Sequence, residues 1–176
     1  MIEQFPAGNF IDATLGNGND LNHILSNPIF KGNVYGFDIQ ADALSATREL
    51  LDSHSVHLNG HYQLIQDSHA NINHYLPEEF SLHGAIFNLG YLPGGDHTIT
   101  TQYDSTLAAL KQITQHLVKK GQVIVVIYSG HPAGQIEKNT LLHELSLWPQ
   151  ESFQVLQYGF INQRNSPPMT LVIEKR

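Results

Sequence analysis

The chain has 176 residues, of which 41% are hydrophobic, and its formal charge is −7. This length favours one domain over residues 1–176, and the hydrophobic content excludes a disordered chain. Cysteine is absent, which excludes disulfides, thiolate zinc sites and cysteine nucleophiles, and the negative charge argues against strong non-specific binding to nucleic acid.

Strands and helices alternate along the first half of the chain. Residues 9–14 predict a short buried strand that leads through a glycine turn into a helix over 20–27, with Asp20 as the helix cap. Apolar spacing then predicts a strand at 34–39, a helix at 41–55, a strand at 62–67, a short helix at 71–76 and a strand at 84–89.

The second half ends differently. A long helix is expected over 103–118, ending at Lys119-Lys120-Gly121, where basic residues and a glycine suit a helix C-terminus. A strand at 122–129 and a helix at 134–147 follow, and the last two strands, 153–160 and 169–176, have no helix between them. The alternation predicts an α/β fold whose parallel sheet has helices on both faces, and the final pair predicts an antiparallel hairpin.

The glycine turn after the first strand is a candidate ligand site. Glycines let a ligand approach the backbone, and the start of the next helix offers free N–H groups. A dinucleotide fingerprint would need a third glycine where Leu21 stands, so a site for a diphosphate is not expected. The candidate binding residues of the turn are Asp12, Thr14, Gly16, Asn17, Gly18, Asn19 and Asp20.

Two later strands also end in acidic residues. Asp38 follows Gly16 by 22 residues, at a position from which a carboxylate can bind both hydroxyls of a ribose. Asp67, with the adjacent Ser68, stands where it would meet an adenine amino group. A strand-end turn or helix cap would explain either Asp alone, but three acidic strand ends beside one glycine turn favour a nucleoside ligand.

Several segments together resemble a known family. DATLGNGND, VYGFDIQ, QDSH, FNLGYLPGGDH and NQRNSPP are similar to the S-adenosylmethionine (SAM)-dependent methyltransferases named as rRNA methylases, which include tRNA 5-(aminomethyl)-2-thiouridine methyltransferases. The resemblance implies a Rossmann-like class I fold, with seven mostly parallel strands and an antiparallel C-terminal hairpin, and SAM as cofactor. The implied cofactor site is the glycine turn with Asp38, Gln40, Asp67, Ser68, His69 and Asn88.

The fourth strand ends in Asn88-Leu89-Gly90-Tyr91, the candidate catalytic segment. The Asn88 side-chain carbonyl and a main-chain carbonyl of Leu89 or Gly90 would accept two amine hydrogens and aim the nitrogen lone pair at the methyl group. Tyr91 would stack on the attached base. The segment resembles the N-P-P-Y motif of amino-group methyltransferases, which favours N-methylation, while the plainer alternative is that Asn88 only satisfies backbone groups at a strand end.

Three histidines follow the third, fourth and fifth strands. His69, His97 and His131 should therefore project at the ligand edge, as proton acceptors, substrate contacts or metal ligands. We favour the first two and expect no metal, because methyl transfer from a sulfonium requires none. The expected substrate-binding residues are Tyr91, Gly94, Gly95, His97, His131, Asn165, Pro167 and Pro168.

The favoured function is N-methylation of the aminomethyl group on the wobble uridine of tRNA, with tRNA as the partner. Methylation of rRNA, methylation of a small-molecule or protein amine, and a SAM-binding sensor without turnover stay open. A basic strip near the pocket, formed by Lys31, Arg48, Lys111, Lys119 and Lys120, would favour RNA.

The N-terminus and the apolar runs bear on location. MIEQFPAG lacks the regions of a signal peptide and no apolar run has the length of a membrane span, so a cytoplasmic protein without a membrane partner is expected. The family usually carries a helix before the first strand and almost no chain precedes it here, so part of the substrate surface is expected to be missing or supplied otherwise. A homodimer stays open.

Overall fold

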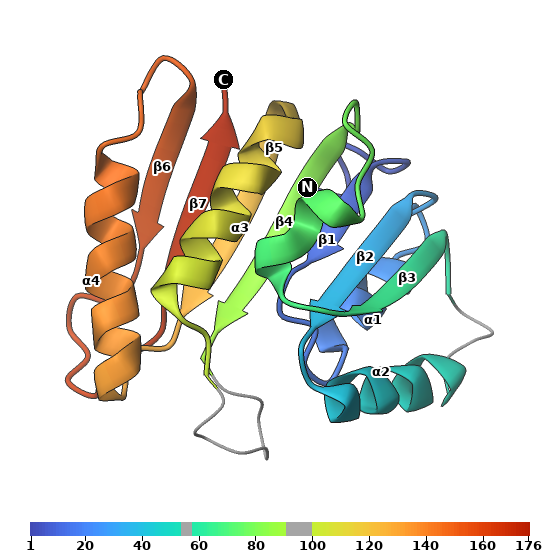
Figure 1. Ribbon diagram of the computed structural model, residues 1–176, viewed down its shortest axis with the longest axis horizontal. Coiled ribbons are helices and arrows are strands. Elements are labelled where there is room, and N and C mark those ends of the chain that lie inside the picture. The colour runs from blue at the N-terminus through green and yellow to red at the C-terminus, as the bar shows by residue number, and fades with distance from the viewer. Residues whose placement is uncertain (54–57, 91–99) are drawn as a thin grey trace.

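The computed structural model describes residues 1–53, 58–90 and 100–176, and these build one seven-stranded sheet (Figure 1). The strand order is β3-β2-β1-β4-β5-β7-β6, and every neighbouring pair is parallel except the two that involve β7. The predicted mostly parallel sheet with an antiparallel C-terminal hairpin is therefore confirmed. The strands are β1 (Asn9–Asp12), β2 (Asn33–Asp38), β3 (His61–Gln66), β4 (Leu82–Leu89), β5 (Leu117–Ile127), β6 (Phe153–Tyr158) and β7 (Met169–Lys175).

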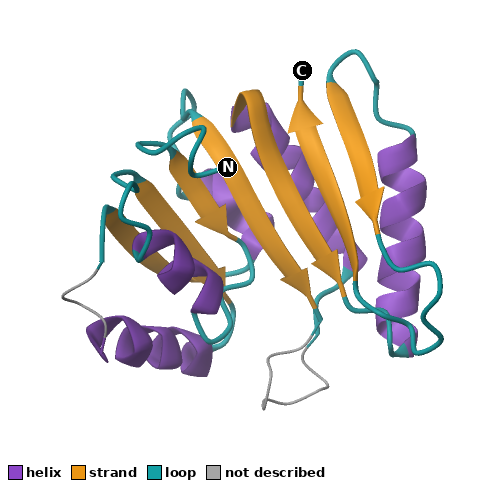
Figure 2. Cartoon of the chain, turned by 180° about the vertical axis from the view of Figure 1, so that it is seen from behind, coloured by secondary structure: helices purple, strands orange, loops and turns teal. Residues whose placement is uncertain are grey.

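Helices cover both faces of this sheet, and each face has its own apolar core. On one face, Ile113 of α3 and Leu141 of α4 pack with Phe87 of β4. On the other, Leu21 of α1 and Leu51 of α2 pack with other buried side chains. Figure 2 shows that α1 and α2 lie over only one end of their face. The helices are α1 (Asn19–Leu25), α2 (Ala41–Ser53), α3 (Tyr103–His116), α4 (Pro132–Ser146) and the 3-10 helix η2 (His69–His74).

The predicted C-terminus of the long helix was wrong. Helix α3 ends at His116, and β5 begins at once with Leu117, which is buried and pairs with Leu82. Lys120 lies within this strand at a positive φ of 67°, where the pairing with β4 shifts register. Burial of Leu117 against the sheet thus outweighs the local preference of two lysines and a glycine for a helix end.

A buried carboxylate holds the N-terminus of α3 against α4. Glu137 of α4 accepts hydrogen bonds from the hydroxyls of Thr101 and Thr106, each at 2.8 Å. Burial raises the pKa of Glu137, and the two hydroxyls oppose this rise. The contact matters for the ligand edge because Thr101 also lines a cavity there.

The strand order places the ends of the central strands at a switch point. Strand β1 pairs with β2 on one side and with β4 on the other, so the connections that leave β1 and β4 run to opposite faces. In open sheets of this kind, ligands bind in the crevice outside the carboxyl ends of the strands at such a point. Within the described residues, no helix is long and apolar enough to span a membrane.

Candidate active site

The glycine turn leaves β1 and enters α1 through two left-handed residues. Gly16 has φ 52° and Gly18 has φ 77°, a conformation that L side chains rarely adopt. A Cβ on Gly18 would also lie 2.6 Å from the Thr47 hydroxyl, so that position excludes any larger residue. Gly18 itself is the N-cap of α1 and no side chain caps the helix, so the prediction that Asp20 is the cap was wrong.

Asp38 at the end of β2 fixes the glycine turn. Its Oδ2 accepts from the N–H of Gly16 at 3.0 Å, and its Oδ1 accepts from the N–H of Gln40 at 2.9 Å. Each carboxylate oxygen can accept more than one hydrogen bond, so both can also meet ligand hydroxyls. The predicted contact with a ribose stays a prediction, and the structure adds a role in holding the turn.

Asp12 lies beneath this turn and is fully buried. Burial, together with the nearby charges of Asp20 and Asp38, raises the pKa of Asp12 to about 7. Its Oδ1 accepts from the N–H of Thr14 at 3.4 Å. Asp12 lines neither of the cavities described below, so it supports the turn from inside.

Asn88 at the end of β4 is joined to the glycine turn by two short hydrogen bonds. Its N–H donates to the Thr14 hydroxyl at 2.6 Å, and its side-chain Nδ2 donates to Asp20 Oδ2 at 2.6 Å. An ionised carboxylate only accepts, so the amide nitrogen must face Asp20 and the amide oxygen Oδ1 is left as an acceptor. Asn88 and Asp20 both line the larger of the two cavities described below.

The main-chain carbonyls after Asn88 are already in use. The Leu89 carbonyl accepts from the N–H of Tyr128 at 3.2 Å, and the Gly90 carbonyl accepts from the N–H of Thr101 at 2.9 Å. The Leu89 side chain is fully buried in the core. Each of these two carbonyls keeps one further lone pair, so Asn88 Oδ1 is the least committed of the predicted amine acceptors.

Asp67 and Ser68 at the end of β3 organise the start of η2. Asp67 accepts from the N–H of Ser68 at 2.7 Å, the amide of Asn71 at 2.9 Å and the hydroxyl of Tyr75 at 2.9 Å. Hydrogen bonds from Asn71, Tyr75 and Ser68 lower the pKa of Asp67. The Ser68 hydroxyl caps η2 by accepting from the N–H of Ala70.

Of the three histidines predicted at the ligand edge, the structure describes His69 and His131, and a hydrogen bond fixes the ring orientation of each. His69 is buried with Nδ1 2.9 Å from the Ala13 carbonyl, so Nδ1 carries the hydrogen, and burial lowers the pKa of His69. His131 is the N-cap of α4 and its Nδ1 accepts from the N–H of Gly134 at 3.1 Å. This nitrogen is therefore engaged in the cap, and the predicted role of His131 as a proton acceptor or substrate contact stays a prediction.

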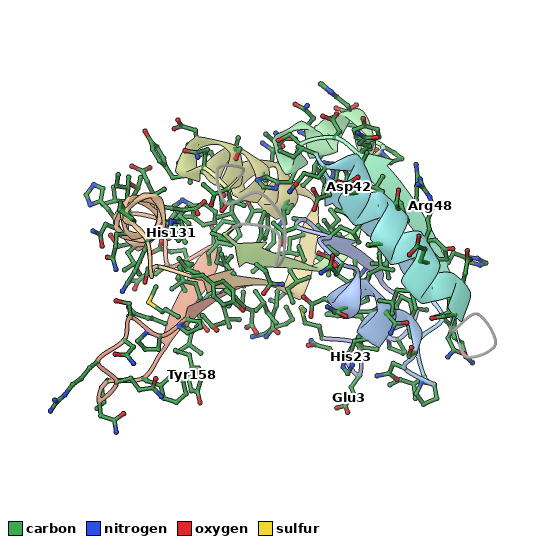
Figure 3. All side chains as sticks on the ribbon, turned by 90° about the horizontal axis from the view of Figure 1, so that it is seen from below. Glu3, His23, Asp42, Arg48, His131 and Tyr158 are labelled. Carbon is green, nitrogen blue, oxygen red and sulfur yellow. The ribbon has the colours of Figure 1, made fainter. Side chains whose placement is uncertain are left out.

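Two adjoining cavities open at the carboxyl edge of the sheet, the edge seen in Figure 3. The nucleoside cavity, as we call it, has a volume of about 210 Å³, and the larger one, the transfer cavity, about 730 Å³. Their walls share Thr14, Gly16 and Gly90. The predicted residues in the nucleoside cavity are Thr14, Gly16, Asp38, Gln40, Asp67, Ser68 and His69, and those in the transfer cavity are Thr14, Gly16, Asn17, Asn19, Asp20, Asn88 and His131.

Some predicted site residues lie elsewhere. Tyr91, Gly94, Gly95 and His97 fall outside the described residues. Asn165, Pro167 and Pro168 lie in the loop 159–168 between β6 and β7 but line neither cavity, whereas their neighbour Ser166, with φ 44°, lines the transfer cavity. Further residues that line the cavities were not predicted from the sequence, namely Ser166, Thr100, Thr101, Gln102, Ser105, Tyr128 and Gly130.

Nothing in their local pattern separates these missed residues from ordinary loop residues. They reach the cavities only because strands from distant parts of the chain end at one edge. The loop 128–131 does follow a parallel strand directly, and that position was the one available signal for Tyr128 and Gly130.

The basic strip whose presence near the pocket would favour RNA is not formed by Lys31, Lys119 and Lys120. Lys31 precedes β2, and Lys119 and Lys120 lie at the start of β5, so all three are at the opposite edge of the sheet. Lys120 is also paired with Glu174 at 2.9 Å. All nine Lys and Arg are in the described residues, and of these Arg164 is the one in a loop at the carboxyl edge.

Comparisons with known proteins point to one family. Residues 34–174 match the family model described as "Putative rRNA methylase". The chain is 33% identical to the chloroplastic tRNA (mnm5s2U34)-methyltransferase of Arabidopsis thaliana in an alignment of 171 positions that covers 94% of this chain. The chain spans 62% of the length of that curated relative.

Solved structures give the same result. A crystal structure described as a putative rRNA methylase from Clostridium thermocellum is 38% identical, with a TM-score of 0.90 over 99% of this chain and 93% of that one. A methyltransferase structure from Streptococcus mutans in complex with SAH is also 38% identical, with a TM-score of 0.84 over 96% and 89%. The fold is therefore the class I methyltransferase fold.

The buried carboxyl of Asp12 predicts a pH dependence of stability. Because its pKa rises from 3.8 to about 7 on folding, its contribution to stability is present below pH 3.8 and is lost as pH rises through 7. Asp12→Asn keeps an acceptor for Thr14 but does not ionise. We expect the unfolding free energy of the variant, relative to wild type, to increase between pH 4 and pH 8 by at most about 4 kcal/mol.

Urea unfolding at several pH values measures this difference. Asp42→Asn is the matched control, because it removes the same charge from an exposed position on α2 (Figure 3). A stability difference between Asp12→Asn and wild type that stays constant over this pH range would contradict the prediction.

Proposed function

We propose, because this chain belongs to the putative rRNA methylase family, that it methylates the aminomethyl group on the wobble uridine of tRNA with SAM as the methyl donor. The observation that carries the N-methylation is the hydrogen bond from Asn88 to Asp20, which turns Asn88 Oδ1 toward an amine. The choice of tRNA is supported by the name of the Arabidopsis relative.

The residues of the nucleoside cavity fit the cofactor. Asp38 offers carboxylate oxygens for ribose hydroxyls, and Asp67 stands at the wall where an adenine would lie. Two buried polar atoms, His69 Nε2 and Thr100 Oγ1, have no hydrogen-bond partner among the described residues, and both residues line this cavity. Three carboxylates around the two cavities, Asp20, Asp38 and Asp67, also suit a ligand that carries positive charge.

The chemistry follows from the position of Asn88. SAM, when bound, would supply a methyl group on a sulfonium, which can pass to an amine lone pair without a metal because its carbon–sulfur bond breaks and the sulfur leaves as a neutral thioether. Asn88 Oδ1 accepts one N–H of the amine and thereby directs its lone pair. The Asp20 carboxylate, one hydrogen bond away, stabilises the positive charge that the nitrogen gains, and the surplus proton leaves to water.

A second candidate function is methylation of a small-molecule or protein amine. It is favoured by the distribution of charge, because Lys31, Lys119 and Lys120 lie at the edge of the sheet away from the cavities. An amine substrate without phosphates would not need them. The same Asn88 chemistry would serve it.

The function is tested by adding purified protein and SAM to tRNA that carries 5-aminomethyl-2-thiouridine, followed by mass spectrometry of the nucleosides. We expect the wobble nucleoside to gain one methyl group. An unchanged wobble nucleoside, in a reaction where the protein methylates a free amine, would favour the second candidate. Methylation of rRNA but not of tRNA would identify rRNA as the substrate and contradict the proposed tRNA function.

Asp38→Ala should weaken SAM binding. The variant loses hydrogen bonds to a charged acceptor and also loosens the turn at Gly16, so we expect the dissociation constant to rise about ten- to hundredfold. Calorimetry with SAM measures it. Asp42→Ala, which removes an exposed carboxylate from the next helix, is the control. A wild-type dissociation constant for Asp38→Ala would remove Asp38 from the site.

Asp20 is predicted to act on turnover through Asn88. Asp20→Ala removes the partner of Nδ2 and frees the amide to turn, so we expect kcat to fall about hundredfold, a larger loss than the accompanying loss of SAM affinity. Asp20→Asn retains an acceptor for Nδ2 and should recover part of this loss. Asn88→Ala should bind SAM normally and lose turnover, a result that also separates an enzyme from a SAM-binding sensor. Wild-type kcat for Asp20→Ala would show that Asn88 needs no positioning.

A further inference from the structure

A row of residues crosses the sheet from the candidate catalytic centre to its edge. Asn88 pairs with Val126, Val126 with Thr170, and Thr170 with Tyr158. Residues directly opposite each other on neighbouring strands share a face, so the side chains of Asn88 and Tyr158 lie on the same face. Three inter-strand spacings separate them, about 14 Å.

This row ends in exposed aromatic side chains. Tyr158 is 69% exposed, Phe160 is 59% exposed and Tyr128 is 47% exposed. Tyr128 and Phe160 follow Val126 and Tyr158 by two residues, at the carboxyl edge where the cavities open. Figure 3 shows Tyr158 on the side of the sheet that carries His23 and Glu3, whereas His131 lies on the other side with α4.

We call this surface the aromatic rim, and it comprises Tyr128, Tyr158, Phe160 and Arg164. It is continuous with the transfer cavity at two points, because Tyr128 lines that cavity and Ser166 of the same loop as Phe160 and Arg164 lines it too. Exposed apolar surface marks interaction sites, so three exposed aromatic rings at the edge where the cavities open, one of which lines the transfer cavity, point to a ligand with flat apolar faces.

We propose that the aromatic rim binds the unpaired nucleotides of an RNA loop that flank the base whose amine enters the transfer cavity. The proposal rests on the proposed tRNA substrate and specifies how it is held. Unstacked bases are recognised by stacking on Tyr and Phe rings, as on the exposed aromatic rings of some four-stranded sheets. The 14 Å between Asn88 and Tyr158 corresponds to about four stacked nucleotides at about 3.4 Å each.

The distribution of charge agrees with this mode of binding. The chain has a charge of −7, and Lys31, Lys119 and Lys120 lie at the edge of the sheet opposite the cavities, so these lysines do not supply phosphate contacts beside the rim. Stacking does not depend on charge. Arg164, the cation in the loop of the rim, supplies either one phosphate contact or a guanidinium plane for a base.

The test measures binding of an anticodon stem–loop RNA by fluorescence anisotropy. We expect Tyr158→Ala and Phe160→Ala each to raise its dissociation constant about five- to hundredfold, and Tyr158→Phe to restore most of the affinity. Arg164→Ala should reduce by about one the slope of log affinity against log salt. In methylation assays, the rim variants should raise KM for tRNA and leave both kcat and the affinity for SAM near wild type.

Tyr62→Ala is the matched control. Tyr62 is 43% exposed on β3, at the opposite end of the sheet from β6, and its removal should change no RNA parameter. Wild-type protein that binds and methylates the RNA, together with rim variants of unchanged RNA affinity, would overturn the rim alone. Wild-type protein that neither binds nor methylates any RNA would overturn the proposed tRNA function as well.

Sedimentation separates RNA from protein as the occupant of the rim. We expect wild type and Tyr158→Ala to have the same mass in solution. A wild-type dimer that Tyr158→Ala dissociates, with RNA affinity unchanged, would assign the rim to a second copy of the chain and overturn the proposal.

Discussion

The site depends on two hydrogen bonds that tie the end of β4 to the glycine turn after β1. Thr14 accepts from the Asn88 N–H and Asp20 accepts from its amide, both at 2.6 Å. These bonds bridge 74 and 68 residues of sequence and can form only because β1 and β4 are neighbours in the sheet. They fix the amide nitrogen of Asn88 on Asp20 and leave Oδ1 as the acceptor on which the proposed chemistry depends.

A concentration of negative charge surrounds this centre. Asp12, Asp20 and Asp38 repel one another when all three are ionised. Burial of Asp12 raises its pKa to about 7 and so favours its neutral form, and two backbone N–H groups donate hydrogen bonds to the Asp38 carboxylate. Such a site attracts a cationic ligand and repels phosphates. The phosphates of an RNA substrate must then stay outside the cavities and be held by interactions other than charge, which is the physical reason why exposed aromatic rings at this edge matter.

Several elements show where local patterns are reliable. The glycine turn, the acidic strand ends and the final hairpin were all predicted, because positive φ, burial and the absence of a crossover helix leave direct marks in the sequence. The boundary at Leu117 was missed because pairing with β4 decided it, and the cap at Gly18 was missed because a left-handed glycine packed against Thr47 of α2 begins the helix. The ring of His131 was predicted to accept a proton, which stays a prediction, and its Nδ1 also caps α4.

The sequence by itself determined the fold class, the family and part of the set of residues that gather at the ligand edge, because each is encoded in short segments of 4 to 11 residues. Only the tertiary structure decided what those residues do for one another. In the structure Asn88 donates a hydrogen bond to Asp20, and Asp38 accepts one from the N–H of Gly16. The lysines of β5 lie at the edge of the sheet opposite the cavities, and Tyr158 lies in one cross-strand row with Asn88. Contacts between strands that are distant in sequence follow from strand order and register, and no local pattern contains them.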